Sequence, residues 1–479
     1  MASFRKIKKG MRKSLKRWAC FFDENRPPFE TDYLKTAEGN RKLFESWGVY
    51  EGERDCKIML ASGMGYGNVG DEAQMGASLG RWKRLLPCAQ LEVLTPSPAY
   101  TRHIHQVESL WAPRVVWFHS NTESTYFKSK LPFKLRFLST WIRLTLTARF
   151  MRSGLPIAFA NEYEMELLSK LYRADALHIS GGGFLTGMTM SRLWENALLM
   201  RLCQLLETPY FLTGQTLGVF RSRWDRWLAR KSLMQADYIY LRDSGLSEAE
   251  LKTIGVQGDH VKSTFDDALF FDSLDEERTR MLLSVNGIDP DRPYAIMNFH
   301  YWGQSEEIRA RSCQRFAELS DYLTEQYGLQ LLFVSMTPSD EAAEDDVIAR
   351  MQHGDHARRL NYQYDYREAR ATYQFARMVF TMKHHPIIFA YGEGVPVVSV
   401  ALDDYYYRKN KGAMDNCGHG RYCLDQSTFY SDQARVSFDV FFDEYDSLKE
   451  ELNLWLSEAR EIETEPMERF IERRGLGKS

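Results

Sequence analysis

The sequence contains no run of about 18 uncharged apolar residues, so it predicts no transmembrane helix. Its first residues lack the apolar core that a secretory signal would have. The seven cysteines are odd in number and mostly scattered, which does not suit a disulfide framework. Together these absences predict a protein of the reducing cytoplasm.

An excess of basic charge is missing as well. The 62 Lys and Arg residues against 65 Asp and Glu residues give a net charge of −3, so we expect no nucleic-acid partner. The sequence is rich in side chains that can form hydrophobic cores, because 44% of its residues are hydrophobic and 13% are aromatic. A chain of 479 residues is too long for one ordinary core, so two domains are expected.

Basic charge is concentrated in two segments. Residues 1–22 carry eight Lys or Arg before the first acid, and their apolar residues recur every three or four positions. Residues 127–154 carry seven basic residues, no acid and many large apolar side chains. Such segments can lie on an anionic membrane, so we expect peripheral contact with the inner face of the cell membrane. The alternatives are a disordered basic tail and an internal helix packed on the core.

Short apolar runs alternate with helix-like runs along most of the chain. In its first half, buried strands are expected at 57–62, 91–95, 114–120, 176–180, 210–214 and 238–242. In its second half they are expected at 294–300, 331–336, 377–382 and 395–402. This alternation predicts an α/β fold with parallel sheets, arranged as two Rossmann-like, doubly wound halves that face a cleft.

The expected domains follow from these runs. They are a basic amphipathic arm (1–50), a Rossmann-like domain with a basic insert near 127–154 (51–285), a second Rossmann-like domain (286–430), and a helical segment with a tail (431–479). The polar, strand-poor stretch around 272–293 is the expected joint. Ligands bind beyond the carboxyl ends of the strands in such sheets, so the loops at those ends carry the candidate site.

The first loop is GMGYGNVGDEAQ, residues 63–74, which follows the first expected strand. It lacks the lysine of a phosphate-binding loop, and Asp71 and Glu72 would repel phosphate at a helix N-terminus. These carboxylates can accept hydrogen bonds from sugar hydroxyls or act as a general base, and Asn68 is assigned with them to a sugar acceptor. The alternative is a tight turn with acidic helix caps.

Three more loops follow expected strands. A run of three glycines leaves backbone N–H groups open, and Gly182 and Gly183 are assigned to a donor substrate; the alternative is close packing of strand and helix. Gln215 lies in a glycine-containing loop and is assigned to the acceptor. Arg242 ends a strand, where a guanidinium group can bind phosphate or carboxylate. Its alternative is a surface ion pair with Asp243 or Glu248.

The fifth loop is the richest in chemistry. Lys383, His384 and His385 stand between an expected strand and a helix that Pro386 is expected to open. Because a helix N-terminus attracts anions and disfavours cations, three cationic groups there indicate a bound anion. The alternative is that one histidine is buried and satisfied while Lys383 is solvated.

In this order the five loops resemble the signature of the polysaccharide pyruvyl transferase family. The matching stretches are GYGNVGDEA, GGG, GQTLG, RDSGLS and KHHPIIFAYGEGVP, within residues 56–402. Where the family has an arginine–x–histidine motif, this chain has Lys383 in place of the arginine. Lysine keeps the charge but loses the bidentate geometry of arginine.

The resemblance implies a GT-B-like enzyme that moves the pyruvyl group of phosphoenolpyruvate, as co-substrate, onto a sugar. The acceptor would belong to a surface polysaccharide or to its polyprenyl-linked precursor, and a ketal would form as phosphate leaves. No metal or other cofactor is implied. The implied donor-binding residues are Arg242, Lys383 and His384. His385 is the implied general acid or phosphate ligand, and Asp71 or Glu72 the base.

Other interpretations of the residues stay open. A nucleotide-sugar glycosyltransferase of the same fold class would place Glu393 on a ribose and the helix end at 384–386 on a diphosphate. A non-catalytic, membrane-bound scaffold would have lost the charges of the site. Zinc at Cys417, His419 and Cys423 is disfavoured, because the cluster lacks a fourth ligand and the usual spacing.

Overall fold

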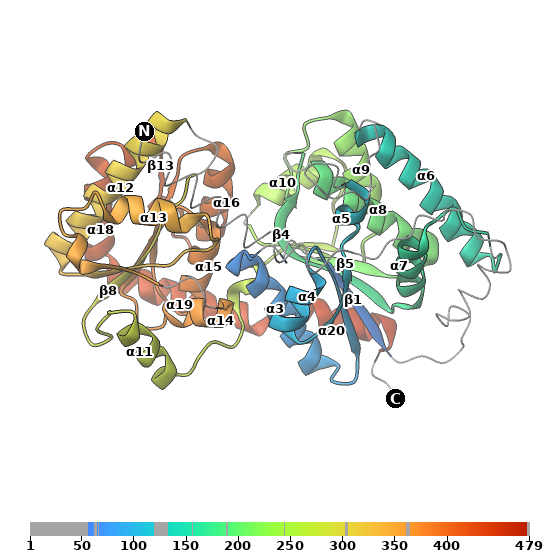
Figure 1. The fold of residues 1–479 in the computed structure, drawn as a ribbon, viewed down its shortest axis with the longest axis horizontal. Coiled ribbons are helices and arrows are strands. Elements are labelled where there is room, and N and C mark those ends of the chain that lie inside the picture. The colour runs from blue at the N-terminus through green and yellow to red at the C-terminus, as the bar shows by residue number, and fades with distance from the viewer. Residues whose placement is uncertain are drawn as a thin grey trace.

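The computed structural model of the protein describes residues 56–61, 65, 67–118, 133–155, 157–187, 190–243, 245–301, 305–360 and 365–476. The predicted basic arm and the first residues of the predicted basic insert lie outside this part of the chain. The described residues form two lobes, each built on one parallel sheet with helices against it (Figure 1). The predicted α/β fold with two doubly wound halves is therefore confirmed.

The first lobe contains a seven-stranded parallel sheet. Its strands are β1 (Lys57–Ala61), β2 (Gln90–Thr95), β3 (Glu108–Trp111), β4 (Ala176–Leu185), β5 (Tyr210–Leu217), β6 (Ile239–Leu241) and β7 (Val261–Ser263). They lie in the order β3-β2-β1-β4-β5-β6-β7. The order reverses between β1 and β4, and in a doubly wound sheet such a reversal is where ligands bind.

Helices cover both faces of this sheet, because its central strands are apolar on both sides. The helices are α3 (Val69–Leu85), α4 (Pro98–His105), α5 (Pro113–Phe118), α6 (Phe133–Arg152), α7 (Glu162–Arg173), α8 (Met190–Leu206), α9 (Arg223–Leu233) and α10 (Leu246–Thr253). A short 3-10 helix, η1 (Asp267–Leu269), follows β7. Helix α7 begins with a reciprocal capping box between Asn161 and Glu164.

The second lobe repeats the design with six parallel strands. They are β8 (Tyr294–Asn298), β9 (Gln330–Phe333), β10 (Ala357–Arg359), β11 (Met378–Thr381), β12 (Val397–Ala401) and β13 (Cys423–Asp425). Their order is β10-β9-β8-β11-β12-β13, so the reversal falls between β8 and β11. One continuous cluster of buried apolar residues forms the core of this lobe.

The helices after β7 complete the second lobe and the C-terminal part. They are α11 (Glu276–Val285), α12 (Glu306–Tyr327), α13 (Asp340–Ile348), α14 (Tyr366–Ala371), α15 (His384–Gly392), α16 (Asp404–Asp415), α17 (Gln426–Phe429), α18 (Gln433–Asp443), α19 (Tyr445–Glu461) and α20 (Glu465–Arg474). Two 3-10 helices, η2 (Gly354–His356) and η3 (Gly420–Tyr422), lie among them. No helix of the described residues has both the length and the apolar character needed to cross a bilayer.

Most predicted strands are present, but the one at 114–120 is wrong. Residues 113–118 form α5, and the strand of this region is the preceding β3. Pro113 explains the difference, because proline favours the first turn of a helix. The helix after β11 also begins earlier than predicted, at His384 and not at Pro386. His384 and His385 therefore belong to its first turn.

The chain returns to the first lobe at its C-terminal end. Met467 and Phe470 of α20 are buried with Trp82 and Phe211 on one face of the first sheet (Figure 1). The Phe470 ring stacks on Phe211, with ring centroids 4.9 Å apart. Helix α20 is thus part of the core of the first lobe, and the chain passes between the lobes twice.

We expect Phe470→Ala to lower the free energy of unfolding by about 3 to 5 kcal/mol, because it removes a fully buried ring. Urea denaturation measures the loss. The matched control is Leu454→Ala on α19, whose side chain is 64% exposed and whose loss should cost less than about 0.5 kcal/mol. Equal losses in the two variants would contradict the docking of α20.

Candidate active site

Three of the predicted loops meet where the two lobes touch, and we call this region the lobe junction. The other two are not loops, because Gly182 and Gly183 lie within β4 and Gln215 lies within β5. The loop that leads into α3 follows β1, Arg242 follows β6, and Lys383 follows β11, each at the carboxyl end of its strand. The lobes are joined there by a backbone hydrogen bond, because the Val69 N–H of α3 donates to the Met336 carbonyl at 3.0 Å.

The glycine loop before α3 is held in place by Glu72. One carboxylate oxygen accepts the Gly65 N–H at 2.6 Å, and the other lies 2.9 Å from Nε2 of His105. Gly65 has φ +87° and faces Thr95, where a Cβ would lie 2.5 Å from the hydroxyl. Asn68 caps α3 by accepting the Gly70 N–H at 3.1 Å. Both Glu72 and Asn68 therefore support the turn itself.

Asp71, one position before Glu72, is placed differently. Its side chain is half-buried and has no hydrogen-bond partner among the residues that the structure describes. Its charge acts across the lobe junction on His385 and Lys409, whose pKa values it raises against the stronger effect of burial. Of the two predicted carboxylates, Asp71 is the one left unpaired.

His385 is packed directly against α3. A Cβ on Gly70 would lie 2.0 Å from Cγ of His385, so only glycine leaves room for the imidazole. Burial lowers the pKa of His385 to about 3, and the ring is therefore neutral near pH 7. Its Nε2 is buried and has no hydrogen-bond partner in the described part of the protein.

Asp266, which follows β7 and precedes η1, joins three elements of the site. Its carboxylate accepts hydrogen bonds from Gln74 of α3 at 2.9 and 3.0 Å and from Arg242 at 2.5 Å. It also lies 3.1 Å from Nε2 of His384 in α15. Although burial raises the pKa of Asp266, the charge of Arg242 and the contact with His384 hold it well below its usual value.

Arg242 is buried and presents one free nitrogen to the lobe junction. Its Nε donates to Thr216 at 2.8 Å and its Nη1 to Asp266, but Nη2 has no partner within the described residues. A Cβ on Gly183 would lie 3.2 Å from this Nη2, 3.4 Å from the Tyr405 hydroxyl and 3.9 Å from Cε of Lys409. The glycine run thus leaves space in front of a cationic cluster.

Lys409, in α16 of the second lobe, completes this cluster. Its ammonium lies 5.9 Å from the ring centroid of Tyr405 and has no ion pair in the part of the chain that the structure describes. Burial first, and the charge of the nearby Arg242 second, lower the pKa of Lys409 to about 7. A buried cation without a counter-ion is costly unless a ligand supplies the negative charge.

Sequence reasoning missed Lys409, Tyr405 and Asp266. Helix α16 reads as a surface helix of tyrosines and charges, and its tertiary contacts alone turn Lys409 toward the junction. Asp266 follows a strand of only three residues, too short to be recognised. The available signal was the pair Asp266–Asp267, two adjacent acids beside an apolar run.

Two other predicted groups are tied to partners. Lys383 donates to both carboxylate oxygens of Asp340, at 2.6 and 2.7 Å, within its own lobe. Gln215 is buried, and its amide nitrogen donates to the carbonyls of Ile179 and Thr213. The roles of Lys383 in donor binding and of Gln215 in acceptor binding stay predictions.

Three further residues discussed from the sequence lie near the site. Gly182 has φ +124°, a backbone conformation that favours glycine, and a Cβ there would press on the Phe184 ring. Glu393, the residue assigned to a ribose in the glycosyltransferase alternative, is bound by Nε of Arg370 at 2.5 Å. His384 keeps one unpaired nitrogen, Nδ1, within the described residues. Burial, with Arg242 second, lowers its pKa to about 3.

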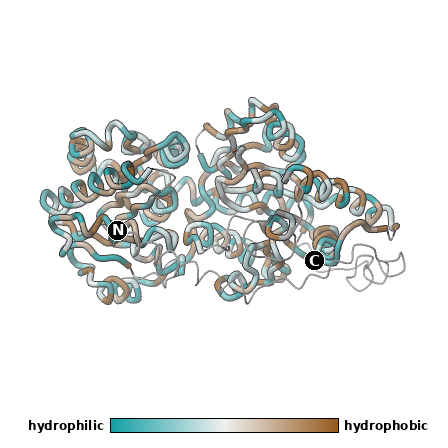
Figure 2. The backbone as a smooth tube through the Cα atoms, turned by 45° about the horizontal axis from the view of Figure 1, so that its top comes forward, coloured by the Kyte–Doolittle hydropathy of each residue, from teal (hydrophilic) through white to brown (hydrophobic). Residues whose placement is uncertain are grey.

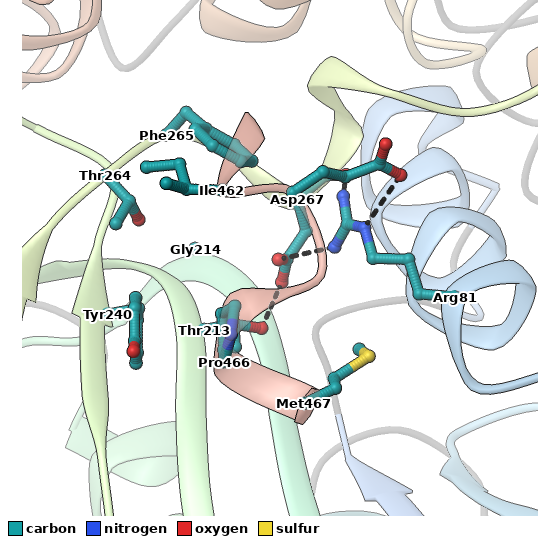
Figure 3. Close-up of a pocket in the computed structure, with 11 residues that line it drawn as sticks. Arg81, Thr213, Gly214, Tyr240, Thr264, Phe265, Asp267, Ile462, Pro466 and Met467 are labelled. Atoms are coloured by element: carbon teal, nitrogen blue, oxygen red, sulfur yellow. Dashed lines mark hydrogen bonds and ion pairs between the residues drawn. The ribbon is translucent and has the colours of Figure 1, made fainter. Parts of the chain in front are cut away.

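Behind the site lies a buried polar network that links α3 to η1 and to the segment between α19 and α20. Asp267 accepts hydrogen bonds from Arg81 and Thr213, and Arg81 also pairs with Glu463 (Figure 3). The cavity beside this network has a volume of about 10 Å³, enough for one water molecule at most. It is therefore a packing gap and not a substrate site.

The described residues contain no group of three His, Cys, Asp or Glu that could hold a metal ion. Cys417 and Cys423, the thiols weighed for zinc, are both buried and free. The Cys417 thiol donates to the Met414 carbonyl at 3.4 Å. Burial raises the pKa of both thiols to about 11.

Comparison with solved structures shows the fold. A glycosyltransferase from Rickettsia africae gives a TM-score of 0.51 at 10% identity, over 89% of this chain and 100% of that one. HepE of Anabaena in complex with UDP-glucose gives a TM-score of 0.50 at 10% identity, over 87% of this chain and 99% of that one. A protein from Listeria monocytogenes that is assigned as a UDP-N-acetylglucosamine 2-epimerase gives a TM-score of 0.51 at 11% identity, over 83% of this chain and 91% of that one.

Comparison of the sequence itself is more specific. No curated protein matches the chain significantly. The sequence profile of one family does match, and it covers residues 68–404, which include four of the five motifs and the first one from Asn68 onward. The chain therefore belongs to the polysaccharide pyruvyl transferase family.

Proposed function

We propose that the protein transfers the pyruvyl group of phosphoenolpyruvate to a sugar of a surface polysaccharide or its lipid-linked precursor and releases phosphate. One observation carries this proposal. Three nitrogen-bearing side chains, Arg242, Lys409 and His385, meet at the lobe junction without a partner for Arg242 Nη2, Lys409 Nζ or His385 Nε2 among the described residues. Phosphoenolpyruvate is a small ligand with both a phosphate and a carboxylate, which such a cluster suits.

The bound donor would change the charges of the site. An anion beside Lys409 and His385 favours their protonated forms, so it raises the pKa of both groups. Lys409, with a pKa of about 7 without ligand, would become fully charged. His385, neutral without ligand, would gain the proton that a general acid needs.

The chemistry follows in balanced steps. His385 delivers its proton to the methylene carbon of phosphoenolpyruvate, and positive charge develops on the carbon that carries the phosphate. A sugar hydroxyl attacks that carbon and loses its proton to Asp71. The C–O bond to phosphate breaks and phosphate leaves with the bonding electrons. A second hydroxyl then attacks the same carbon, closes the ketal and gives its proton to His385, which is neutral after the first step. Arg242 and Lys409 stabilise the charge of the leaving phosphate.

The base is assigned to Asp71 because the two adjacent carboxylates differ in their contacts. Glu72 is 2% exposed and engages Gly65 and His105, whereas Asp71 has no hydrogen-bond partner among the described residues. The assignment of Lys383 as a secondary donor ligand is kept, since its charge acts on Lys409. Its pairing with Asp340 makes it weaker than Lys409 in this role.

A nucleotide-sugar glycosyltransferase is the competing function. Its fold is the same, but Glu393, the residue assigned to the ribose, is held by Arg370. Thermal shift assays separate the two functions without an acceptor. We expect phosphoenolpyruvate to raise the melting temperature, and UDP and GDP to have little effect. If only UDP or GDP raised the melting temperature, glycosyl transfer would be the better proposal and pyruvyl transfer would be contradicted.

We expect donor affinity to fall above pH 7, because the free enzyme must then protonate Lys409 to bind the anion. The dissociation constant for phosphoenolpyruvate, measured by calorimetry, should rise by up to about tenfold per pH unit between pH 7 and 9. Lys409→Arg should abolish this rise, since a guanidinium group stays charged. Lys411→Met is the matched control, because Lys411 pairs with Asp415 on the same helix. A pH dependence that persists in Lys409→Arg would contradict the assignment.

We expect His385→Gln to lower turnover at least about a hundredfold, the usual cost of losing a general acid. The assay follows phosphate release from phosphoenolpyruvate with pyruvate-free surface glycan as acceptor, and no release is expected without acceptor. His353→Gln is the control, because His353 lies on the surface beside Glu325. Near-normal turnover of His385→Gln, with an unchanged melting temperature, would remove His385 from the mechanism.

We expect Asp71→Asn and Glu72→Gln to separate chemistry from structure. Asp71→Asn should lower kcat about a hundredfold or more while the melting temperature and donor affinity stay unchanged. Glu72→Gln should instead lower the melting temperature, because the buried contact with His105 is weakened. The reverse pattern would make Glu72 the base.

A further inference from the structure

Helix α6 is apolar on two opposite faces. Its inner face buries Phe137, Leu144 and Met151 against the first lobe. Its outer face exposes Leu135, Leu138, Ile142 and Leu146, which recur every three or four residues and are 36% to 51% exposed. A helix of a water-soluble surface is normally polar on the outside, so the outer stripe requires an explanation.

Helix α9 exposes aromatic side chains in the same region. Trp224 and Trp227 are each 44% exposed, and their rings stack with centroids 4.9 Å apart. Leu228 and Leu233 of the same helix are buried and hold it on the lobe. The exposed tryptophan pair is therefore a feature of a well-anchored helix.

The two helices form one surface. Both α6 and α9 pack on α8, where Trp194 lies between them. The Trp194 ring centroid is 4.5 Å from that of Phe137 in α6 and 6.3 Å from that of Trp224 in α9. Figure 1 shows α6 and α9 side by side on the outside of the first lobe, and Figure 2 shows apolar stretches on this part of the chain. We call it the α6/α9 face.

Exposed charges on the α6/α9 face are basic. Helix α6 contains no acid, and the acid of α9, Asp225, is buried as a partner of Ser222 and Trp194. Arg143, whose position within α6 argues against a span, is neutralised by Glu164 at 2.8 and 2.9 Å. The exposed basic residues are Lys134, Arg149, Arg221, Arg223, Arg226, Arg230 and Lys231.

We propose that the α6/α9 face docks on an anionic phospholipid bilayer. Tryptophan prefers the boundary between headgroups and acyl chains, and the aliphatic stripe of α6 would enter the same layer. Arginine and lysine side chains extend from such a face to anionic headgroups. Helix α6 lies within the segment 127–154, for which the sequence predicted membrane contact. Helix α9 is a second element of the proposed contact, and the sequence did not indicate it.

Charge complementarity favours lipid over other occupants. A second copy of the chain would bring a similarly basic face opposite this one, and like charges oppose such pairing. Nucleic acid would match the basic residues but not the four aliphatic side chains of α6, which an anionic bilayer accommodates. The proposal does not depend on the transferred group, so it can fail while pyruvyl transfer holds, and the reverse.

The test is co-sedimentation of the full chain with vesicles. We expect binding to phosphatidylcholine vesicles that contain about 30% phosphatidylglycerol, little binding to pure phosphatidylcholine, and release by high salt. Trp224→Ser with Trp227→Ser should weaken binding at least about tenfold, because two interfacial anchors are lost. Arg226→Glu with Arg230→Glu should weaken it by a similar factor.

Matched controls come from the second lobe. Met281→Ser with Val285→Ser removes apolar side chains of α11 that are 65% and 79% exposed, and Lys449→Glu with Arg311→Glu reverses two exposed charges. We expect both pairs to bind vesicles like the unaltered protein, and all variants to keep its melting temperature.

Three outcomes would overturn the proposal. Full binding by the tryptophan variant would show that the α6/α9 face is not the contact and that another segment, such as residues 1–22, suffices. A tryptophan-dependent dimer in light scattering, without vesicle binding, would assign the face to a second copy. Binding of single-stranded RNA with the same residue dependence, again without vesicle binding, would assign it to nucleic acid.

Discussion

The carboxylate of Asp266 is the interaction on which the site depends. It lies in the interior, where a lone charge would be very costly, and three partners from three elements offset that cost. Gln74 comes from α3, Arg242 from the end of β6 and His384 from the first turn of α15. Because Asp266 engages Nη1 of Arg242 and Nε2 of His384, the remaining nitrogen of each side chain is turned toward the lobe junction. One buried acid thus joins the lobes and orients one free donor, Nη2 of Arg242, and one free acceptor, Nδ1 of the neutral His384.

Paired and unpaired charges have different tasks around this acid. Glu72 pairs with His105, Lys383 with Asp340 and Glu393 with Arg370, and each pair stabilises a loop or a helix end. Asp71, Lys409 and Nε2 of His385 have no such partner among the described residues, and they lie between the lobes. The paired charges have their partners within the folded protein, so the unpaired groups are the ones available to a ligand. This separation is the physical basis for assigning anion binding to Lys409 and proton transfer to Asp71 and His385.

The sequence predicted the sheets well because their central strands are apolar runs followed by glycine or polar loops. It predicted the strand at 114–120 wrongly, since apolar content alone does not distinguish a short helix from a strand when Pro113 can begin either. Three-residue edge strands such as β7 carry too little pattern to recognise. The motifs located the segments of the site. They did not show which charged side chains form ion pairs, because this depends on which side chains come within reach of one another in the folded chain. Lys409 could be found only from tertiary contacts, and the exposed Trp224 pair only from burial, whereas for Asp266 the sequence offered one signal, the adjacent acid Asp267.

Helix α20 delays the completion of the first lobe until the second lobe has been synthesised. Domains generally fold in order as they leave the ribosome, yet here the face of the first sheet around Trp82 is covered by residues made after the whole second lobe. Until then that apolar face is open to water or to a chaperone, while the second lobe, continuous in sequence, can close at once. The lobe made first is therefore finished last. Nascent chains that stop short of α20 would present an exposed aromatic surface to the quality-control machinery of the cell.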